Sequence, residues 1–269
     1  MLKPDPDWLV PEGLPANVGG LMATRAGGYS TGSFAGLNLR PVELPPMPGQ
    51  DADDATALLR NRERFTASLE GAMPVWLNQV HGTQVQLLDG SMLDAGAAPG
   101  GADGAGGLPV ADASITTQHG VACTVLVADC LPVLFATTDG AGVGAAHAGW
   151  RGLAHGVLEA TVARLCEATG QVPAQVHAWL GACIGPTQFE VGEDVRAAFG
   201  PACEAFFKLG PVPGKWMADL PGLARWRLQQ AGVRLISGGQ WCTVSAPERF
   251  FSYRRDRQTG RHAAAIWRR

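Results

Sequence analysis

The sequence predicts an α+β fold in which layered, mixed β-sheets are flanked by helices. The chain has 269 residues, of which 46% are hydrophobic and 17% are charged, so it can bury a sizeable core. Three short apolar runs, at 121–127, 132–137 and 142–146, follow one another closely and indicate buried strands. Strands outnumber helices and do not alternate with them regularly, which favours α+β over a doubly wound sheet.

The first part of the chain mixes loops with short elements. Glycine and small polar residues at 22–39 indicate a strand end followed by a structured loop, and the proline-rich stretch 41–54 indicates an exposed connection. Periodicity then predicts a helix over 55–69 and strands over 75–80 and 84–88. The Gly/Ala/Asp-rich segment 90–109 predicts a flexible surface insertion in what we expect to be a single domain, 1–269.

The second half begins with a helix that we predict over 153–169, where apolar residues recur at helical spacing and Gly170 follows the end. A helix over 220–231 is predicted with Asp219 as N-cap and Gly232 just past its end. The remaining predicted elements are a helix over 193–199 and strands over 176–183, 233–236 and 262–267.

The charge of the chain excludes some classes of partner. A net charge of −3, from 21 basic and 24 acidic residues, argues against a dedicated nucleic-acid binder. Residues 1–10 lack the apolar stretch of a signal peptide, and Asp129 interrupts the longest apolar run, 121–136. We therefore expect a soluble cytoplasmic protein that binds no membrane and whose six cysteines are free thiols.

Two familiar motifs fail on inspection. Gly142-Val143-Gly144 begins like a dinucleotide fingerprint, but His147 stands where the third glycine is needed for close helix–strand packing. The segment 28–32 matches GxSxG, but the residues after it are poor helix formers, so a glycine-rich turn is the better interpretation.

Three polar residues end predicted strands and precede small residues or proline: His81, Cys130 and His147. Such positions lie at a sheet edge, where loops form sites. Two imidazoles and one thiolate would leave one position open on tetrahedral zinc, which is the pattern of catalytic sites. The alternative is that these are packing residues, because a cysteine after a buried strand is commonly a small hydrophobe. The other histidines lack this setting, and we interpret them as packing or surface residues: His119, His155, His177 and His262.

Several long motifs resemble the YfiH/YlmD-like family, from about Ala23 to the C-terminus: NQVHG, ADCLPVLF, AAHAGWRGL, GACIGPTQFEVGEDV and ERFFSYRRD. Its members were first labelled polyphenol oxidases or laccases, and relatives were later described as purine nucleoside phosphorylases with adenosine deaminase activity. In that family the strand-end His, the Cys of the ADC motif and the His of the HAGWRG motif bind zinc. The resemblance therefore implies that His81, Cys130 and His147 are the metal ligands and the catalytic centre, on a fold related to cysteine hydrolases.

The implied substrates are phosphate and a purine nucleoside such as adenosine, inosine, guanosine or methylthioadenosine. Zinc with an open position could activate water for attack on C6 of adenine, or hold phosphate for attack on the anomeric carbon of ribose. Arginine suits phosphate, and the resemblance suggests Arg25 as a substrate or phosphate contact. Arg151 could reach the same rim or form a structural salt bridge.

Neighbouring residues are expected to support the site. We expect Asn78, which we also take as a substrate-binding residue, and Gln79 to order the loop that carries His81. Strand alternation points the side chain of Asp129 away from that of Cys130, so we interpret it as orienting a neighbouring loop. The segment 183–186 is expected to line the pocket, with Phe189 and Glu190 beside it.

The segment 249–269 holds seven arginines and one aspartate. We interpret it as a solvated face with ion pairs in preference to a phosphate-binding role, with 253–255 as the place to look for an exception.

Three other enzymatic functions compete with the phosphorylase, and a non-enzymatic binding role is the last alternative. A multicopper oxidase needs more imidazole ligands than six histidines supply, although copper could occupy the zinc site adventitiously. Metal-free catalysis would use Cys130 activated by His147. The resemblance also suggests a hydrolase that edits peptidoglycan precursors through the same two residues. We expect a monomer or a small homo-oligomer.

Overall fold

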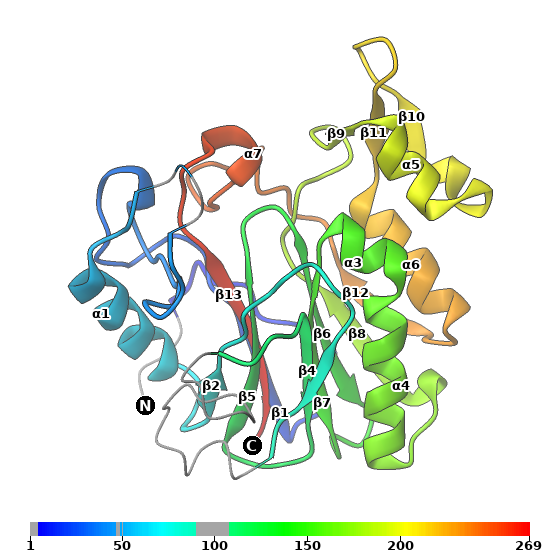
Figure 1. The fold of residues 1–269 in the computed structure, drawn as a ribbon. Helices are drawn as coiled ribbons and strands as arrows, with labels where there is room; N and C mark the ends of the chain where they lie inside the picture. The colour runs from blue at the N-terminus through cyan, green and yellow to red at the C-terminus, as the bar shows by residue number, and fades with distance from the viewer. Residues whose placement is uncertain (1–4, 47–48, 50, 90–107) are drawn as a thin grey trace.

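Two β-sheets packed face to face form the centre of this computed structural model, and helices cover their outer faces (Figure 1). The structure describes residues 5–46, 49, 51–89 and 108–269. The insertion predicted over 90–109 lies almost wholly outside these residues. The observed architecture confirms the predicted α+β class with layered, mixed sheets.

The four-stranded sheet brings the two ends of the chain together. Its order is β1 (Val18–Met22), β13 (His262–Arg268), β5 (Val121–Val127) and β2 (Met73–Val75). Strand β13 runs antiparallel to both β1 and β5, while β2 runs parallel to β5. The outer face of this sheet packs against Phe65 of α1 (Ala55–Thr66) and Leu69 just beyond it.

The six-stranded sheet carries most of the predicted central strands. Its order is β12 (Leu235–Gly238), β8 (Val176–Leu180), β6 (Leu131–Thr137), β7 (Val143–Ala148), β4 (Ala113–Thr116) and β3 (Val85–Leu87). Strand β6 is antiparallel to both β7 and β8. Three helices cover its outer face: α3 (Trp150–His155), α4 (Val157–Thr169) and α6 (Leu220–Gln230).

The core between the sheets explains why the central strands are continuously apolar. Neighbouring residues of β5 belong to two different buried clusters: Val125 and Val127 pack between the two sheets, and Leu126 packs on the other face. A strand buried on both faces has no position that favours a polar side chain. The apolar runs that predicted these strands are therefore the direct result of the double packing.

A small third sheet stands at one end of the molecule, above α3 and α6 in Figure 1. It contains β10 (Phe207–Leu209), β11 (Trp216–Ala218) and β9 (Glu190–Val191), with α5 (Glu193–Phe199) beside it. Short helices complete the structure: η1 (Gly32–Phe34), η2 (Pro173–Gln175), η3 (Pro201–Phe206) and α7 (Tyr253–Asp256). In the part of the chain described here, no helix is long and apolar enough to cross a membrane.

The predicted elements differ from the structure at some boundaries. The helix predicted over 153–169 begins earlier, at Trp150, and is broken into α3 and α4 by Gly156, whose φ of 97° no helix interior accepts. The strand predicted over 75–80 ends at Val75, because the chain then leaves one sheet to enter the other. Strand β4 and the small third sheet were not predicted. Helix α6 has the predicted cap, since the Asp219 carboxylate accepts the Gly222 N–H.

Candidate metal centre and adjoining cavity

Three separate segments bring His81, Cys130 and His147 together at one end of the two sheets. His81 lies in the loop after β2, Cys130 in the turn between β5 and β6, and His147 near the end of β7. One ligand atom from each lies within 4.8 Å of the others, and His81 Nε2 is 3.8 Å from Cys130 Sγ. Ligand atoms of a tetrahedral zinc site lie about 3.5 Å apart, so this donor set could hold such an ion if the ligand atoms closed in by about 1 Å or less.

Asp112 holds both histidines of the cluster. Its buried carboxylate accepts His147 Nδ1–H at 2.8 Å, which leaves Nε2 of that ring for a ligand. The same carboxylate accepts the backbone N–H groups of Val80, His81 and Gly82, at 3.1, 2.9 and 2.6 Å. These bonds hold His81 at a φ of 63°, a left-handed conformation that costs about 1–2 kcal/mol without such support.

Asp112 is a site residue that the sequence analysis missed. It stands directly before the apolar residues of β4, just after the Gly/Ala-rich segment. A single acidic residue at the start of an apolar run is the available signal, and recognising β4 would have been needed to use it. Gln79 also supports the His81 loop, as expected, because its side-chain amide exchanges two hydrogen bonds with the Leu126 backbone, at 2.7 and 2.8 Å.

The charges of the cluster are coupled. Burial opposes ionisation of the Cys130 thiol, but the charge of His147 and hydrogen bonds from both histidines outweigh it and lower the Cys130 pKa. Burial also opposes protonation of His147, but the Cys130 thiolate and the Asp112 hydrogen bond raise its pKa. Burial likewise acts to raise the pKa of Asp112, and the bonds from His147 and Gly82 reverse that effect. Without a metal, the cluster therefore favours a thiolate–imidazolium pair.

Gly149 leaves the space in which these side chains meet. A Cβ atom at this position would lie 2.7 Å from His81 Cδ2 and 3.1 Å from Cys130 Sγ. Gly152, one turn further on, packs against the same loop, because a Cβ there would lie 2.8 Å from the Gly82 carbonyl oxygen. The small residues of the HAGWRG motif are thus required by the close approach of α3 to the His81 loop.

An open cavity of about 170 Å³ adjoins Cys130. Its walls are mostly apolar or aromatic, and they are formed by Ala128, Asp129, Cys130, Trp150, Ile184, Phe189, Leu220, Tyr253 and Arg254. The sequence analysis expected the segment 183–186 to line the pocket with Phe189 beside it, and Ile184 and Phe189 do line this cavity. Cys130 is the member of the cluster that lines this cavity, and the space beside it could hold a flat organic ring.

Asp129 ties the Cys130 turn to the C-terminal segment. Its carboxylate accepts the hydroxyl groups of Thr243 and Ser252 at 2.6 and 3.0 Å, and the Arg254 N–H at 2.6 Å. It orients a neighbouring loop as expected, but the reason differs. Asp129 lies in a turn with a φ of 91°, not in a strand, so strand alternation does not set its direction.

None of the three predicted substrate-binding residues, Arg25, Asn78 and Arg151, is among the residues that line this cavity. The Arg25 guanidinium donates to the Ala35 and Pro247 carbonyls, at 3.0 and 2.9 Å, and lies over the Phe251 ring. Arg151 is exposed, and its guanidinium stacks on the Trp150 ring at 4.4 Å. Asn78 is half-buried, and its backbone pairs with Pro109 and Ala111 in the stretch that leads into the His81 loop.

The fold and the three-ligand cluster define a mixed-sheet protein with a candidate metal centre. Comparison with known proteins specifies the family, since residues 20–269 match the model described as multi-copper polyphenol oxidoreductase laccase. The chain belongs to this family, which includes the YfiH and YlmD proteins.

Relatives match over almost the whole chain. A purine nucleoside phosphorylase of Pseudomonas aeruginosa is 43% identical over 264 residues, which is 97% of this chain and 98% of that protein. The purine nucleoside phosphorylase YfiH of Escherichia coli is 42% identical, with 97% of each chain covered. The crystal structure of YlmD from Geobacillus stearothermophilus superposes with a TM-score of 0.84 at 31% identity, covering 100% of this chain and 98% of that one.

Proposed function

We propose that this chain is a zinc-dependent purine nucleoside phosphorylase with adenosine deaminase activity, centred on His81, Cys130 and His147. The observation that carries the proposal is that these three ligand atoms converge in a space kept by Gly149, and that one of the three residues, Cys130, also lines a cavity with aromatic walls. Relatives more than 40% identical over nearly their whole length are named purine nucleoside phosphorylases, which supports the substrate class.

Each residue of the cluster has a part in this proposal. His81, Cys130 and His147 would hold the ion, and bound zinc would supply Lewis acidity to an oxygen nucleophile. Asp112 keeps the proton of His147 on Nδ1, so that Nε2 stays free as a ligand atom. We favour zinc over copper because, in the described chain, this is the one group of at least three His, Cys, Asp or Glu residues close enough to bind a metal. A multicopper enzyme needs several such groups.

The cavity is suited to the nucleoside. The rings of Trp150, Phe189 and Tyr253 offer faces on which a purine can stack. In the phosphorolysis that we propose, a phosphate oxygen bonds to C1′ of the ribose while the C1′–N9 bond breaks. The bond's electron pair leaves with the base, which takes up the proton that hydrogen phosphate loses, and the products are ribose 1-phosphate and the free purine.

We also propose that the described layers belong to one domain, because strands from both sheets share the buried cluster between them.

All six cysteines are free, which supports a reducing compartment such as the cytoplasm. We further infer that Asn78 and Arg151 act at the rim of the site. Arg25 is a weaker choice, since backbone carbonyls already occupy its guanidinium.

Product analysis tests the proposal. Purified protein is incubated with adenosine, with and without phosphate, and the products are separated by chromatography. We expect adenine only when phosphate is present, and a smaller amount of inosine in either case. A chelator and the substitution His147→Ala should each abolish both products. The matched control is His155→Ala, which removes an exposed histidine at the end of α3. Full activity in both the chelated protein and His147→Ala would contradict the proposal.

A second candidate is a metal-free thiol hydrolase, such as one that edits peptidoglycan precursors. It is favoured by one observation: Cys130, His147 and Asp112 form the nucleophile–base–carboxylate series of cysteine hydrolases. An activity that resists chelators but is lost with iodoacetamide would support this candidate over the phosphorylase.

A further inference from the structure

Arg254 is the single cationic side chain among the residues that line the cavity next to Cys130. The other charged group in the lining, Asp129, has its carboxylate occupied by Thr243, Ser252 and the Arg254 backbone. The cavity wall therefore combines apolar and aromatic surface with one positive charge. An anionic ligand, or the anionic part of a ligand, would be drawn to this charge because the surroundings screen it weakly.

Arg254 and its neighbour Arg255 are used in opposite ways. The Arg255 guanidinium points into the network and donates to the carbonyls of Thr243, Val244 and Phe250, at 2.9, 3.2 and 2.9 Å. It also pairs with the Asp256 carboxylate at 2.7 Å. These contacts use all of its hydrogen-bonding nitrogens to hold the C-terminal loops together. Arg255 is thus a structural residue with no donor group to spare.

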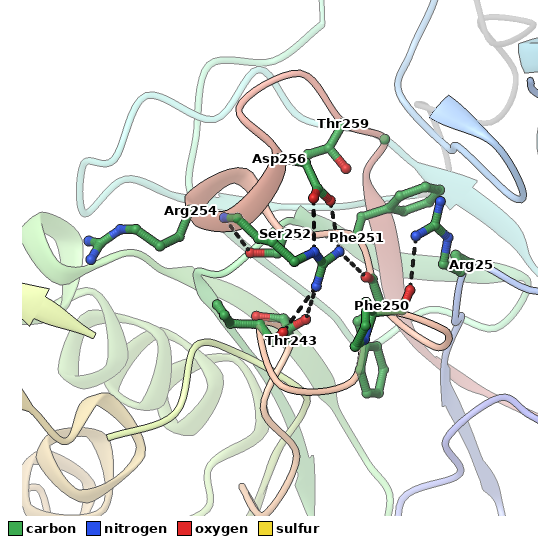
Figure 2. A network of polar contacts seen from close by, with 12 residues as sticks. Arg25, Thr243, Phe250, Phe251, Ser252, Arg254, Asp256 and Thr259 are labelled. Carbon is green, nitrogen blue, oxygen red and sulfur yellow. Dashed lines mark hydrogen bonds and ion pairs between the residues drawn. The ribbon is translucent and has the colours of Figure 1, made fainter. Parts of the chain in front are cut away.

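The Arg254 side chain extends away from that network (Figure 2). Its Nη1 donates to the Glu190 carbonyl at 2.8 Å, and its Cζ lies 5.4 Å from the centre of the Phe189 ring. A guanidinium has five N–H donors, so four remain beyond this bond. The aromatic contact holds the planar group in place, and the remaining N–H groups can form the two-point contact that arginine makes with phosphate.

The backbone of Arg254 is fixed to the turn that carries a ligand of the candidate metal centre. Its N–H donates to Asp129, the residue directly before Cys130, at 2.6 Å. Ser252 Oγ donates to the same carboxylate and accepts the Arg255 N–H. The Asp129 carboxylate therefore ties the Arg254 backbone to the Cys130 turn, while Glu190 and Phe189 hold the guanidinium on the wall of the same cavity. Such anchoring limits the freedom that a binding group would lose when a ligand arrives.

We propose that Arg254 binds the phosphate co-substrate in this cavity, between the aromatic wall at Phe189 and the cluster at Cys130. This inference rests on the proposed function for the identity of the nucleophile. It assigns a role to a residue in the arginine-rich C-terminal segment, where Arg255, one position later, is structural.

Two variants of Arg254 and two controls test the assignment. Arg254→Gln removes the charge, and Arg254→Lys keeps it without the two-point geometry. Arg164→Gln removes one charge from an exposed ion pair on α4 and controls for net charge. Arg255→Gln controls for loss of the structural network. Michaelis constants for phosphate and for nucleoside are measured separately, and binding of inorganic phosphate alone is measured by calorimetry.

We expect Arg254→Gln to raise the Michaelis constant and the Kd for phosphate at least about tenfold, with the nucleoside constant changed less than about twofold. Arg254→Lys should lie between this variant and the wild type, and Arg164→Gln should match the wild type. Arg255→Gln should lower the melting temperature more than either Arg254 variant does. An unchanged phosphate Kd and Michaelis constant in Arg254→Gln would overturn the assignment.

The calorimetry separates this inference from the proposed function. If the wild type binds phosphate through Arg254 but releases no purine from nucleosides, the proposed function is wrong and Arg254 remains an anion-binding residue. If the wild type cleaves nucleosides with phosphate and Arg254→Gln behaves identically, the proposed function stands and the Arg254 assignment is wrong. If the wild type neither binds phosphate nor cleaves nucleosides, both are wrong.

Discussion

Asp112 Oδ1 lies 2.8 Å from His147 Nδ1, and the carboxylate that makes this contact also receives three consecutive backbone N–H groups of the His81 loop. One buried residue therefore fixes the orientation of the His147 ring and the backbone conformation at His81. The two histidines belong to segments far apart in the chain, and neither their order nor their spacing would align them. Asp112 thus positions a loop residue and a strand residue as one pair of candidate ligands.

The substitution Asp112→Asn should weaken metal binding and destabilise the fold. An amide keeps the shape but loses one acceptor oxygen, so backbone donors of the His81 loop lose their partner, at a cost of about 2–4 kcal/mol. Loss of the carboxylate partner of His147 should lower zinc affinity about 10–100-fold. Zinc affinity is measured by competition with a chromophoric chelator, and stability by urea unfolding.

The control for this variant is Asp194→Asn, an exposed carboxylate in the first turn of α5, which should leave zinc affinity unchanged and lower stability by less than about 1 kcal/mol. Equal zinc affinity in Asp112→Asn and in the wild type would show that Asp112 does not position the ligands.

The sequence was most informative where packing acts on both faces of an element. Strands β5 and β6 were predicted almost to their observed ends because burial on two sides demands an unbroken apolar run. Helix α6 was predicted because its N-terminal cap is local: Asp219 and Gly222 are three residues apart. The grouping of His81, Cys130 and His147 was predicted from their positions at the ends of predicted strands and from the family resemblance, and the structure brings the three together.

The unpredicted features depend on contacts between distant segments. Strand β9 has two residues and exists because β11, well beyond it in the chain, pairs with it. The role of Asp112 was not predicted because its partners Gly82 and His147 lie 30 positions before it and 35 positions after it. Tertiary contacts decide these features over local preference.

The substitution Gly149→Ala should disturb the candidate metal centre while leaving the fold intact. Its φ and ψ of −64° and 157° suit alanine, so the cost is steric and falls on His81 Cδ2 and Cys130 Sγ. We expect zinc affinity to fall at least about tenfold, as for other changes that displace ligands. The melting temperature should change by only a few degrees. Bound zinc is measured by atomic absorption after dialysis against a zinc buffer.

Gly170→Ala is the control for Gly149→Ala, because it should change stability and not zinc content. This position has a φ of 70° and open space around a Cβ, so alanine strains the backbone by about 1 kcal/mol without approaching the cluster. It should lower stability and leave zinc content unchanged. If both variants lost zinc equally, the effect of Gly149→Ala would be general destabilisation and not loss of space at the ligands.

In metal-free protein, iodoacetamide should modify Cys130 before the other cysteines. The charge of His147 overcomes burial and lowers the Cys130 pKa, so more of the reactive thiolate is present at pH 7 than the ordinary value of about 8.5 allows. Substituting His147→Ala removes this charge, raises the thiol pKa and should slow the reaction at least about tenfold. Added zinc should protect Cys130. Peptide mapping by mass spectrometry measures each rate.

Cys242 provides the comparison within the same molecule. It is half-buried, and although burial acts to raise its pKa, hydrogen bonds from Ser245 and Gly185 lower it, independently of His147. Its modification rate should therefore be the same in His147→Ala and in the wild type. A Cys130 rate that also stays the same would show that no charge on His147 activates the thiol.

His262 should make the protein less stable as the pH falls through about 6. Burial, aided by the charges of nearby arginines, lowers the pKa of this histidine to about 3, against about 6.5 in the unfolded chain. Its Nε2 accepts the Phe251 N–H at 2.8 Å, and protonation there would break that bond. Between these two pKa values the unfolded chain binds a proton that the native protein does not.

The contribution of His262 to stability is thus complete above about pH 6.5 and declines as the pH falls, by up to about 1.4 kcal/mol per pH unit. Urea unfolding between about pH 7 and 4 should show a shallower pH dependence for His262→Gln, whereas the exposed-site control His155→Gln should follow the wild type. A ring NMR signal of His262 that titrates near pH 6.5 in the native protein would contradict the prediction, because the folded and unfolded states would then bind the proton equally.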